Sequence, residues 1–420
     1  MLPMLNVDQA LGLIRETVSS APKQASSLLD ALGSRLAEKI VCPEDSPPFD
    51  KSMMDGFAVR SSDLRIGEIE FSKIGELAAG HESTLSIGSG QTIQIMTGAP
   101  IPEGADVVIP VEQSRELGDS RICLTLESEV ASGRNILRQG TNMRVDEDVI
   151  ASGQLIRPQE IALLAEMGLA HVPVYPKPSV AILATGDELV PVDATPGPGQ
   201  IRNSNALMLA QQVSAAGAVP EILDIARDNR EDLRAKIQQG LQADFLCLSG
   251  GVSAGKLDLV PSELERAGVR KVFHKVAMKP GKPIWFGKRE TEPASECYVF
   301  GLPGNPVSSM VCFELFVRTA LQKFSGSPNA SPQLLEAELT KKFEQRGDRD
   351  VWFPSIVEAD SNKLHLTPTN WKGSSDLRST ILANCSALFP AGIHTFQRGE
   401  TVQVLLWSGS RIEPKLTHNS

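Results

Sequence analysis

The chain has 420 residues, of which 41% are hydrophobic and 22% are charged, and its formal net charge is -10. This length allows three or four domains, and the composition is that of an ordinary soluble protein. An acidic chain argues against long nucleic acid, which favours a broad positive surface, and no apolar stretch predicts a membrane span or a secretion signal.

The six cysteines are far apart, without a Cys-x-x-Cys pair or a histidine at metal-ligand spacing. This pattern argues against a zinc site and against a disulfide framework. We therefore expect a protein of the reducing cytoplasm.

The N-terminal residues have the spacing of an amphipathic helix. Apolar residues recur every three or four positions from Val7 to Val18, behind Asn6 as a candidate N-cap. This pattern predicts a helix over residues 6–20. A second helix is expected near residues 27–40.

From Cys42 onward the sequence consists of short segments in which apolar and polar residues alternate, separated by glycine and proline turns. This pattern predicts a β-rich module. Helical spacing returns at residues 158–167. We therefore expect a discontinuous helical N-terminal domain, residues 1–41 and 137–176, interrupted by an inserted β-rich domain over residues 42–136.

After Pro178 strands and helices alternate, which predicts a largely parallel sheet covered on both faces. This α/β domain is expected to span residues 177–326. Its predicted helices cover residues 203–216, 229–241, 258–267 and 306–323. Short strands fill residues 327–420 and predict a small β barrel or sandwich, which we take to be a barrel.

Three glycine-rich turns follow apolar runs between residues 244 and 306, in DFLCLSGGVSAGKLD, VAMKPGKP and YVFGLPGNP. Glycine allows positive φ and lets backbone N–H groups approach an anion. In open sheets of this kind, ligands sit at the carboxyl ends of the strands, where these turns fall. Together the turns predict one anion-binding cleft.

A basic segment lies in the same stretch, because residues 266–289 contain several lysines and arginines but no Asp or Glu. In an acidic protein this segment favours a small anionic ligand. The alternative is that these lysines only solvate a strand and its turn.

Four acidic residues follow predicted strands or glycine turns: Asp187, Glu188, Asp228 and Asp258. Carboxylates beside a phosphate site are suitable ligands for Mg²⁺, which bridges a few of them to phosphate oxygens. The alternative is that they are helix caps or turn residues.

Seven strings carry a resemblance to a known family. In chain order they are PPFDKSMMDGFAVR, MTGAP, TGDEL, IRNSN, GGVSAGKLD, MKPGKP and GLPGNPVS, and they are spread over residues 47–308. In these strings the chain resembles the MoeA/gephyrin family of molybdopterin molybdenumtransferases. The SMMDGFA segment and the β-rich tail make the resemblance specific, because the molybdopterin-binding domain also occurs in other proteins.

The resemblance implies a cytoplasmic enzyme of molybdenum cofactor biosynthesis that works as an elongated homodimer with Mg²⁺. Its substrates would be adenylylated molybdopterin and molybdate. The enzyme would cleave the phosphoanhydride, release AMP and leave molybdenum on the dithiolene. Other cofactor-biosynthesis proteins and recipient molybdoenzymes are candidate partners, whereas nucleic acid and membrane are not expected.

The resemblance also implies roles for residues of the α/β domain. The turn formed by Gly250, Gly251 and Ser253 would hold the pterin phosphate or the AMP moiety. The metal and the attacking oxygen would be held by Glu188, Asp228 and Asp258. Transition-state charge would be neutralised by Lys275 and Lys279.

Further positions match the family in the other segments. From the β-rich module, Asp55 and Thr97 would approach the cleft of the other subunit. In the GLPGNP turn and just after it the matching residues are Pro303, Pro306 and Ser308. In the tail, Arg349 and Ser374 would lie near the molybdate oxyanion, where a guanidinium can bind two oxygens.

The chain departs from the family pattern at Asn142, where relatives commonly carry an acid in a Gly-Glu-Asp turn. Asparagine keeps the hydrogen-bonding shape but loses the charge. Either activity is weakened or the nearby Asp146 and Asp148 compensate.

Two other functions stay open. A catalytically weak homologue could hold molybdopterin as a carrier or scaffold, and Asn142 is the main support for this reading. A different hydrolase on the same nucleotide-binding domain would leave the SMMDGFA module and the tail unexplained.

Overall fold

The computed structural model describes residues 4–81, 84–251, 259–290, 296–360 and 362–414. The chain forms two compact units. The larger unit comprises Met1–Ala37, Gly153–Ile161 and His171–Ser420, and the smaller unit comprises Glu38–Ser152 and Ala162–Ala170. The predicted four-domain division remains a prediction.

The smaller unit is built on a six-stranded sheet, as the alternating pattern predicted. Its strand order is β8-β5-β7-β6-β10-β9. The strands are β5 (Gly56–Val59), β6 (Gly67–Leu77), β7 (Gln91–Ile95), β8 (Val107–Pro110), β9 (Ser114–Gly118) and β10 (Arg121–Leu126). Buried side chains on both faces of the sheet, among them Phe57 and Phe71 on one face and Ile93 on the other, form its core.

Short elements complete the smaller unit. Two ribbons pair β4 (Lys51–Ser52) with β11 (Ile136–Leu137) and β3 (Ile40–Val41) with β12 (Asp148–Ile150). Single 3-10 turns are η1 (Ser61–Asp63) and η2 (Val111–Gln113). Helix α2 (Pro158–Glu166) crosses the boundary between the units along the chain.

The larger unit begins with the predicted N-terminal helix, α1 (Val7–Thr17). The Asn6 side chain accepts a hydrogen bond from the Gln9 backbone at 2.8 Å, and the Gln9 side chain accepts one from the Asn6 backbone at 2.9 Å. This reciprocal capping box satisfies two backbone donors and fixes the start of the helix.

The expected second helix near residues 27–40 was wrong. Strands β1 (Gln24–Ser27) and β2 (Arg35–Leu36) flank a turn there, and both pair with β13 (His171–Tyr175). Gly33 in the turn has φ +79°, which a right-handed helix excludes. The strand partner lies more than 130 residues away in the sequence, so local spacing could not reveal it.

The α/β sheet has the strand order β17-β14-β18-β22-β21-β19. The first four strands are parallel, as predicted, and β21 and β19 add an antiparallel edge. In chain order the strands are β14 (Ser179–Ala184), β17 (Val219–Ile222), β18 (Phe245–Ser249), β19 (Val269–His274), β21 (Trp285–Arg289) and β22 (Cys297–Leu302). A parallel ribbon pairs β15 (Leu189–Val190) with β16 (Ile201–Arg202).

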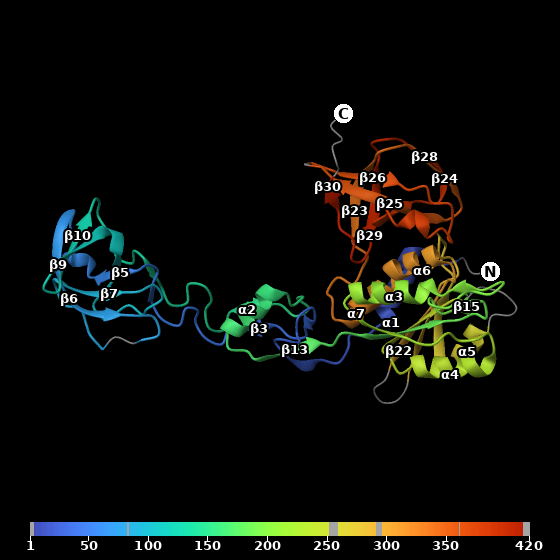
Figure 1. Ribbon diagram of the computed structural model, residues 1–420, viewed down its shortest axis with the longest axis horizontal. Helices are drawn as coiled ribbons and strands as arrows, with labels where there is room; N and C mark the ends of the chain where they lie inside the picture. Colours follow the sequence, from blue (N-terminus) through green and yellow to red (C-terminus); the bar gives the residue numbers. More distant parts are fainter. Residues whose placement is uncertain (1–3, 82–83, 252–258, 291–295, 361, 415–420) are drawn as a thin grey trace. The chain divides into compact units, whose positions relative to one another are not determined.

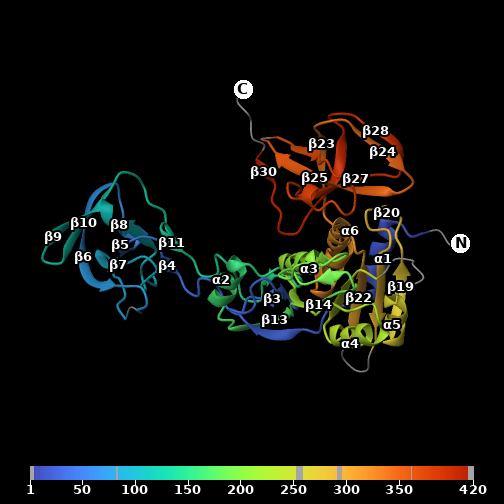
Figure 2. The same cartoon turned by 45° about the vertical axis from the view of Figure 1, so that its right-hand side comes forward.

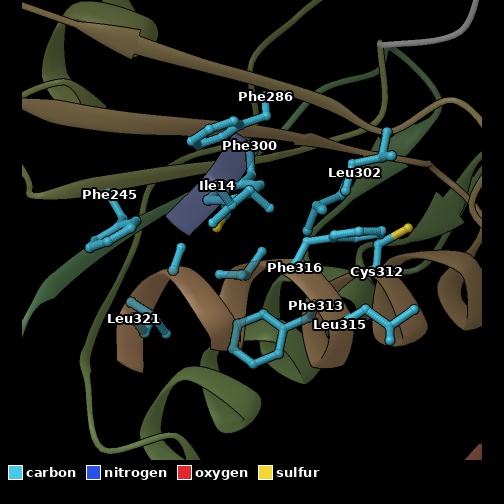
Figure 3. Packing of buried hydrophobic residues seen from close by; sticks show 14 of the residues in the cluster. Ile14, Phe245, Phe286, Phe300, Leu302, Cys312, Phe313, Leu315, Phe316 and Leu321 are labelled. Atoms are coloured by element: carbon cyan, nitrogen blue, oxygen red, sulfur yellow. The ribbon is translucent and has the colours of Figure 1, made fainter. Parts of the chain in front are cut away.

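Helices cover both faces of this sheet (Figure 1). One face carries α1, α3 (Ser204–Ala215) and a helical run made of α6 (Pro306–Cys312), the π-helical turn η3 (Phe313–Val317) and α7 (Arg318–Phe324). The other carries α4 (Arg230–Gly240) and α5 (Val260–Arg266). Figure 3 shows the core on the first face, with Phe245 and Phe300 of the sheet packed opposite Phe316 and Leu321.

The C-terminal residues form a closed barrel, as expected. Its strands pair in the ring β25-β26-β23-β29-β27-β25, and Figure 2 shows them from a second direction. They are β23 (Leu334–Leu339), β25 (Asp350–Ala359), β26 (Leu364–Pro368), β27 (Cys385–Phe389) and β29 (Thr401–Leu406). Outside the ring, β20 (Met278–Lys279) and β30 (Glu413–Pro414) pair with β25, β24 (Phe343–Gly347) pairs with β28 (Gly392–Phe396), and η4 (Arg378–Thr380) precedes β27.

All six cysteines are buried free thiols. Burial raises the pKa of Cys385 to about 12, so this thiol stays protonated at neutral pH. Within the described part of the chain, no helix combines the length and apolar character needed to cross a membrane.

Candidate functional site

A pocket of about 350 Å³ lies at the carboxyl ends of three parallel strands of the larger unit. Thr185 follows β14, Gly250 follows β18 and Gly304 follows β22, and all three line the pocket. This is the edge of an open α/β sheet where ligands ordinarily bind. The other lining residues are Glu188, Leu189, Ile201, Arg202, Asn203, Ser204, Asn205, Ser249, Asn305 and Pro306.

Glycine is required at the first turn. Gly250 has φ +98°, and a Cβ built there would lie 2.8 Å from the Thr185 carbonyl oxygen. A Cβ built on Gly304 would lie 3.7 Å from the Gly250 Cα, so the turns after β18 and β22 are in contact. Two of the three predicted glycine turns therefore meet at one pocket, and Gly251, with φ +64°, continues the first.

The N-terminus of α3 closes one side of the pocket. The Asn203 side chain caps the helix by accepting from the Ala206 backbone at 3.2 Å. The Asn205 amide donates to the Ser249 hydroxyl at 2.9 Å and to the Gly304 carbonyl at 2.7 Å. One side chain thus holds the ends of β18 and β22 together beside a helix terminus that favours anions.

The GLPGNP turn brings in a residue of the tail. The Asn305 amide donates to the Ser374 hydroxyl at 2.9 Å, and the Val307 backbone donates to the Ser374 carbonyl at 3.1 Å. The predicted Ser374 therefore lies beside the pocket, next to Pro306, the first residue of α6.

Two other residues predicted in this turn have structural contacts. The Pro303 carbonyl accepts a hydrogen bond from the Ser309 hydroxyl. Ser308 is buried in the first turn of α6, and it is not among the pocket-lining residues of the described chain. Both fix the loop, and their contacts give neither of them a place on the pocket wall.

The acidic residues are divided between the pocket and its surroundings. Glu188 lines the pocket, and the Asp228 backbone N–H donates to the Asp187 carboxylate at 3.1 Å, so the loops after β14 and β17 are adjacent. Asp258, the third predicted metal ligand, and Ser253 of the glycine turn lie outside the described residues.

The fit to a divalent cation is limited. Among the described residues no three acidic, histidine or cysteine side chains form a metal-binding group. Mg²⁺ commonly uses one or two carboxylates together with water and substrate phosphate oxygens. Glu188 and Asp228 suit that arrangement, whereas a site built from protein ligands alone is not present in the described part.

The predicted lysines and Arg349 belong to a second group around β20. Lys275, with φ +73°, donates its backbone N–H to Ile284 at 2.8 Å. Lys279 lies in β20, which pairs with β25. The Arg349 guanidinium donates to the Met278 carbonyl at 3.3 Å. Arg349 thus contacts the strand that carries Lys279, and none of these three residues lines the pocket as described.

Asp55 and Thr97 meet within the smaller unit. The Asp55 carboxylate accepts from the Thr97 backbone at 2.7 Å and from its hydroxyl at 2.8 Å. The backbone hydrogen bond, followed by that of the hydroxyl, lowers the pKa of Asp55, because both favour the charged form. Thr97 therefore holds the charged Asp55 carboxylate in a fixed orientation on the surface of that unit.

The turn with the unusual Asn142 also lies in the smaller unit. Asn142 is exposed, and its backbone donates to the Ser46 carbonyl at 2.9 Å. Asp148 forms an ion pair with Lys39 at 2.8 Å, and Asp146 occupies a turn with φ +66°. The Asp148 carboxylate, one of the two acids expected to compensate for Asn142, is therefore already paired with Lys39.

Sequence reasoning missed the residues that shape the pocket wall, namely Thr185, Asn203, Asn205 and Asn305. The Thr185 hydroxyl oxygen is buried and has no hydrogen-bond partner among the described residues. The sequence offered a local signal for Asn203, because Asn directly before a helix is a strong N-cap. Asn205 lies inside α3, and the Asn305 side chain donates to Ser374 instead of capping α6, so their roles depend on distant segments.

Three family models match the chain in succession. They are the MoeA N-terminal region (domain I and II) over residues 5–168, the probable molybdopterin binding domain over residues 181–323 and the MoeA C-terminal region (domain IV) over residues 336–407.

Relatives match over nearly the full length. The chain is 35% identical to the molybdopterin molybdenumtransferase of Bacillus subtilis over 406 residues, covering 95% of this chain and 93% of that one. It is 34% identical to the protein of the same name from Staphylococcus aureus strain Mu50 over 418 residues, covering 98% and 97%. A molybdopterin biosynthesis MoeA protein from Pyrococcus horikoshii OT3 has a similar structure, with a TM-score of 0.79, 28% identity and coverage of 96% and 100%.

Proposed function

The chain belongs to the MoeA family, and on this premise we propose that it is a molybdopterin molybdenumtransferase, an enzyme of molybdenum cofactor biosynthesis. Its substrates are adenylylated molybdopterin and molybdate, and its products are the molybdenum-bearing pterin and AMP. The observation that carries this proposal is the pocket where Asn205, Gly250 and Gly304 meet at the ends of β18 and β22.

The pocket binds the phosphate part of the adenylylated pterin. The backbone N–H of Gly251 and the N-terminal end of α3 supply partial positive charge without bulky side chains in the way, while the Gly250 N–H donates to the Leu302 carbonyl at 3.2 Å. Pro306 lines the pocket, Pro303 belongs to the turn before it, and Ser308 lies buried in the helical turn that follows. We assign Ser253, which lies outside the described residues, to the same ligand.

The transfer itself requires charge compensation. Cleavage of the phosphoanhydride builds negative charge on oxygen, and Lys275 and Lys279 neutralise it. Arg349 and Ser374 orient the molybdate oxyanion. Asp55 and Thr97 act at the cleft of a second subunit, so the enzyme works as a homodimer.

Mg²⁺ supports the reaction in this proposal. Glu188, Asp228 and Asp258 would hold it, and when bound it would supply positive charge to the phosphate oxygens. The enzyme acts in the cytoplasm and hands its product to other cofactor-biosynthesis proteins or to molybdoenzymes.

The test is molybdate-dependent release of AMP by the purified protein from adenylylated molybdopterin with Mg²⁺. We expect turnover by the unmodified protein and a fall of about a hundredfold or more in Asp228→Ala and Asp258→Ala. Glu116→Ala, an exposed acid on β9, is the matched control and should retain full turnover.

Two other results would reject the transferase. Pterin binding without AMP release would identify a carrier or scaffold, the second candidate, which Asn142 favours. Failure to bind the pterin at all would point to a different hydrolase.

A further inference from the structure

A buried carboxylate joins the helical layer of the α/β domain to the barrel within the larger unit. Glu314, in the π-helical turn η3, is 1% exposed. One of its oxygens accepts from Gln212 of α3 at 2.8 Å. The other accepts from Arg318 at 3.1 Å, and from the Ser408 backbone at 3.0 Å and hydroxyl at 2.9 Å. A charge so deeply buried is tolerated because every one of these donors is in place.

The same helical run contacts the barrel at two places. At its start, Asn305 and Val307 bond to Ser374. In its middle, Glu314 bonds to Ser408, and Arg318 donates to the Leu406 carbonyl at 3.1 Å. The barrel is therefore held at two places on the run, one beside the pocket and the other about two helical turns further along.

The π-helical turn lies at the second attachment. Such turns are uncommon and are frequently found at functional sites. Here Glu314 and Arg318, one turn apart, both bond to the residues around the end of β29. The packed core between the two attachments is close to rigid, so a shift at one is transmitted to the other.

We propose that Glu314 is a positioning residue of the reaction. By fixing Leu406 and Ser408 on the helical run, it keeps Ser374 in contact with Asn305 at the edge of the pocket. This inference rests on the proposed function, because it assigns Glu314 an effect on molybdate transfer through Ser374.

The variant Glu314→Gln isolates this role. Glutamine keeps the volume but replaces one acceptor oxygen with an amide donor, which would face Gln212 or the Arg318 and Ser408 donors. We expect kcat/KM for molybdate to fall about tenfold, while the Kd for adenylylated molybdopterin changes by less than about threefold.

A double-mutant cycle supplies the readout that a merely structural role would not move. Ser374→Ala alone is expected to lower kcat/KM for molybdate by about tenfold. If Glu314 acts through Ser374, kcat/KM of the double variant should equal that of the less active single variant. Independent effects would instead multiply. Multiplying effects, or unchanged turnover in Glu314→Gln, would overturn the inference.

Two further variants keep the test decisive. Ser408→Ala removes a single hydroxyl donor to Glu314, so it serves if Glu314→Gln does not fold, and the same non-additivity with Ser374→Ala is expected. Glu160→Gln is the matched control, because Glu160 is also a buried carboxylate paired with an arginine, but its partners lie within six residues in the sequence. Glu160→Gln should leave kcat/KM for molybdate unchanged, both alone and in the Ser374→Ala background. Absence of turnover in the unmodified protein would reject the proposed function itself, a result distinct from additive variants of an active enzyme.

Discussion

Asn205 uses both hydrogens of its side-chain amide, one on the Ser249 hydroxyl and one on the Gly304 carbonyl. A hydrogen bond of this kind contributes about 0.5–1.5 kcal/mol, and a buried partner left unpaired costs about 1–3 kcal/mol. The shape of the pocket therefore depends on an amide at this position, because aspartate has the same shape but no hydrogens to donate.

Asn205→Asp should weaken binding of adenylylated molybdopterin by about tenfold or more, because it removes two donors and adds a negative charge facing phosphate. Isothermal titration calorimetry measures the change. Gln211→Glu, the same amide-to-acid exchange at an exposed position of α3, is the control and should bind as the unmodified protein does. Equal affinity of both variants would refute the role of Asn205.

Glu160 makes stability depend on pH. Hydrogen bonds from the Arg157 side chain hold the pKa of Glu160 at about 2, below its usual 4.5. A depressed pKa means that the folded state favours the charged form, so this stabilisation is complete above pH 4.5 and is lost as the pH falls towards 2. Glu160→Gln should therefore lower the free energy of unfolding at pH 7 and have a smaller effect near pH 3. Urea unfolding at both pH values checks this, and an equal effect at both would contradict the pairing.

At the scale of elements, the turn after β18 sets how closely the chain approaches the ligand. Gly250 has positive φ, and a Cβ there would lie close to the Thr185 carbonyl. Both features require glycine. The turn can therefore shift only by moving the loop after β14 as well.

Gly250→Ala should lower the melting temperature and weaken pterin binding together. Gly217→Ala separates the two causes, because Gly217 also has positive φ but a Cβ there would meet nothing within 4 Å. The control variant should lose stability by the strain of its φ, about 1 kcal/mol, without any loss of binding. Binding lost equally in both variants would show that strain alone explains Gly250.

Elements with local signals were predictable, and elements with distant partners were not. The helix at α1 could be predicted because its apolar spacing and its Asn6 cap are both local. The helix expected near residues 27–40 gave way to strands because β13, their partner, is distant in the sequence. The small strands β20 and β24 were missed for the same reason, since each is defined by its pairing with a separate segment.

At the scale of the whole molecule, each compact unit has its own core. The smaller unit is built around residues such as Phe71, and the larger unit contains the cluster around Phe300. Proteins with separate cores often unfold in more than one step.

Calorimetry should therefore resolve more than one thermal transition. Phe71→Ala should lower one of them, because deletion of a buried phenylalanine costs about 3–5 kcal/mol, while Phe300→Ala should lower another. If both variants shift a single transition by similar amounts, the cores unfold together and the division into independent units fails.

The site was predictable in its chemistry and less so in its geometry. Glycine turns and acids at strand ends are visible in the sequence, and Gly250 and Glu188 do line the pocket. The asparagines of the wall were not assigned because their role depends on contacts with segments far along the chain, such as Ser374 with Asn305. Lys279 lies in β20, which pairs with β25, and Arg349 contacts β20 from just before β25. This pairing also joins segments that are far apart in the sequence.

The most direct measurement is a crystal structure of the protein with adenylylated molybdopterin. We expect the phosphates beside Gly251 and the start of α3, within hydrogen-bond distance, about 3 Å, of the backbone N–H groups of Gly251 or Asn205. A ligand bound elsewhere, with the pocket between Thr185, Gly250 and Gly304 left empty, would contradict the account.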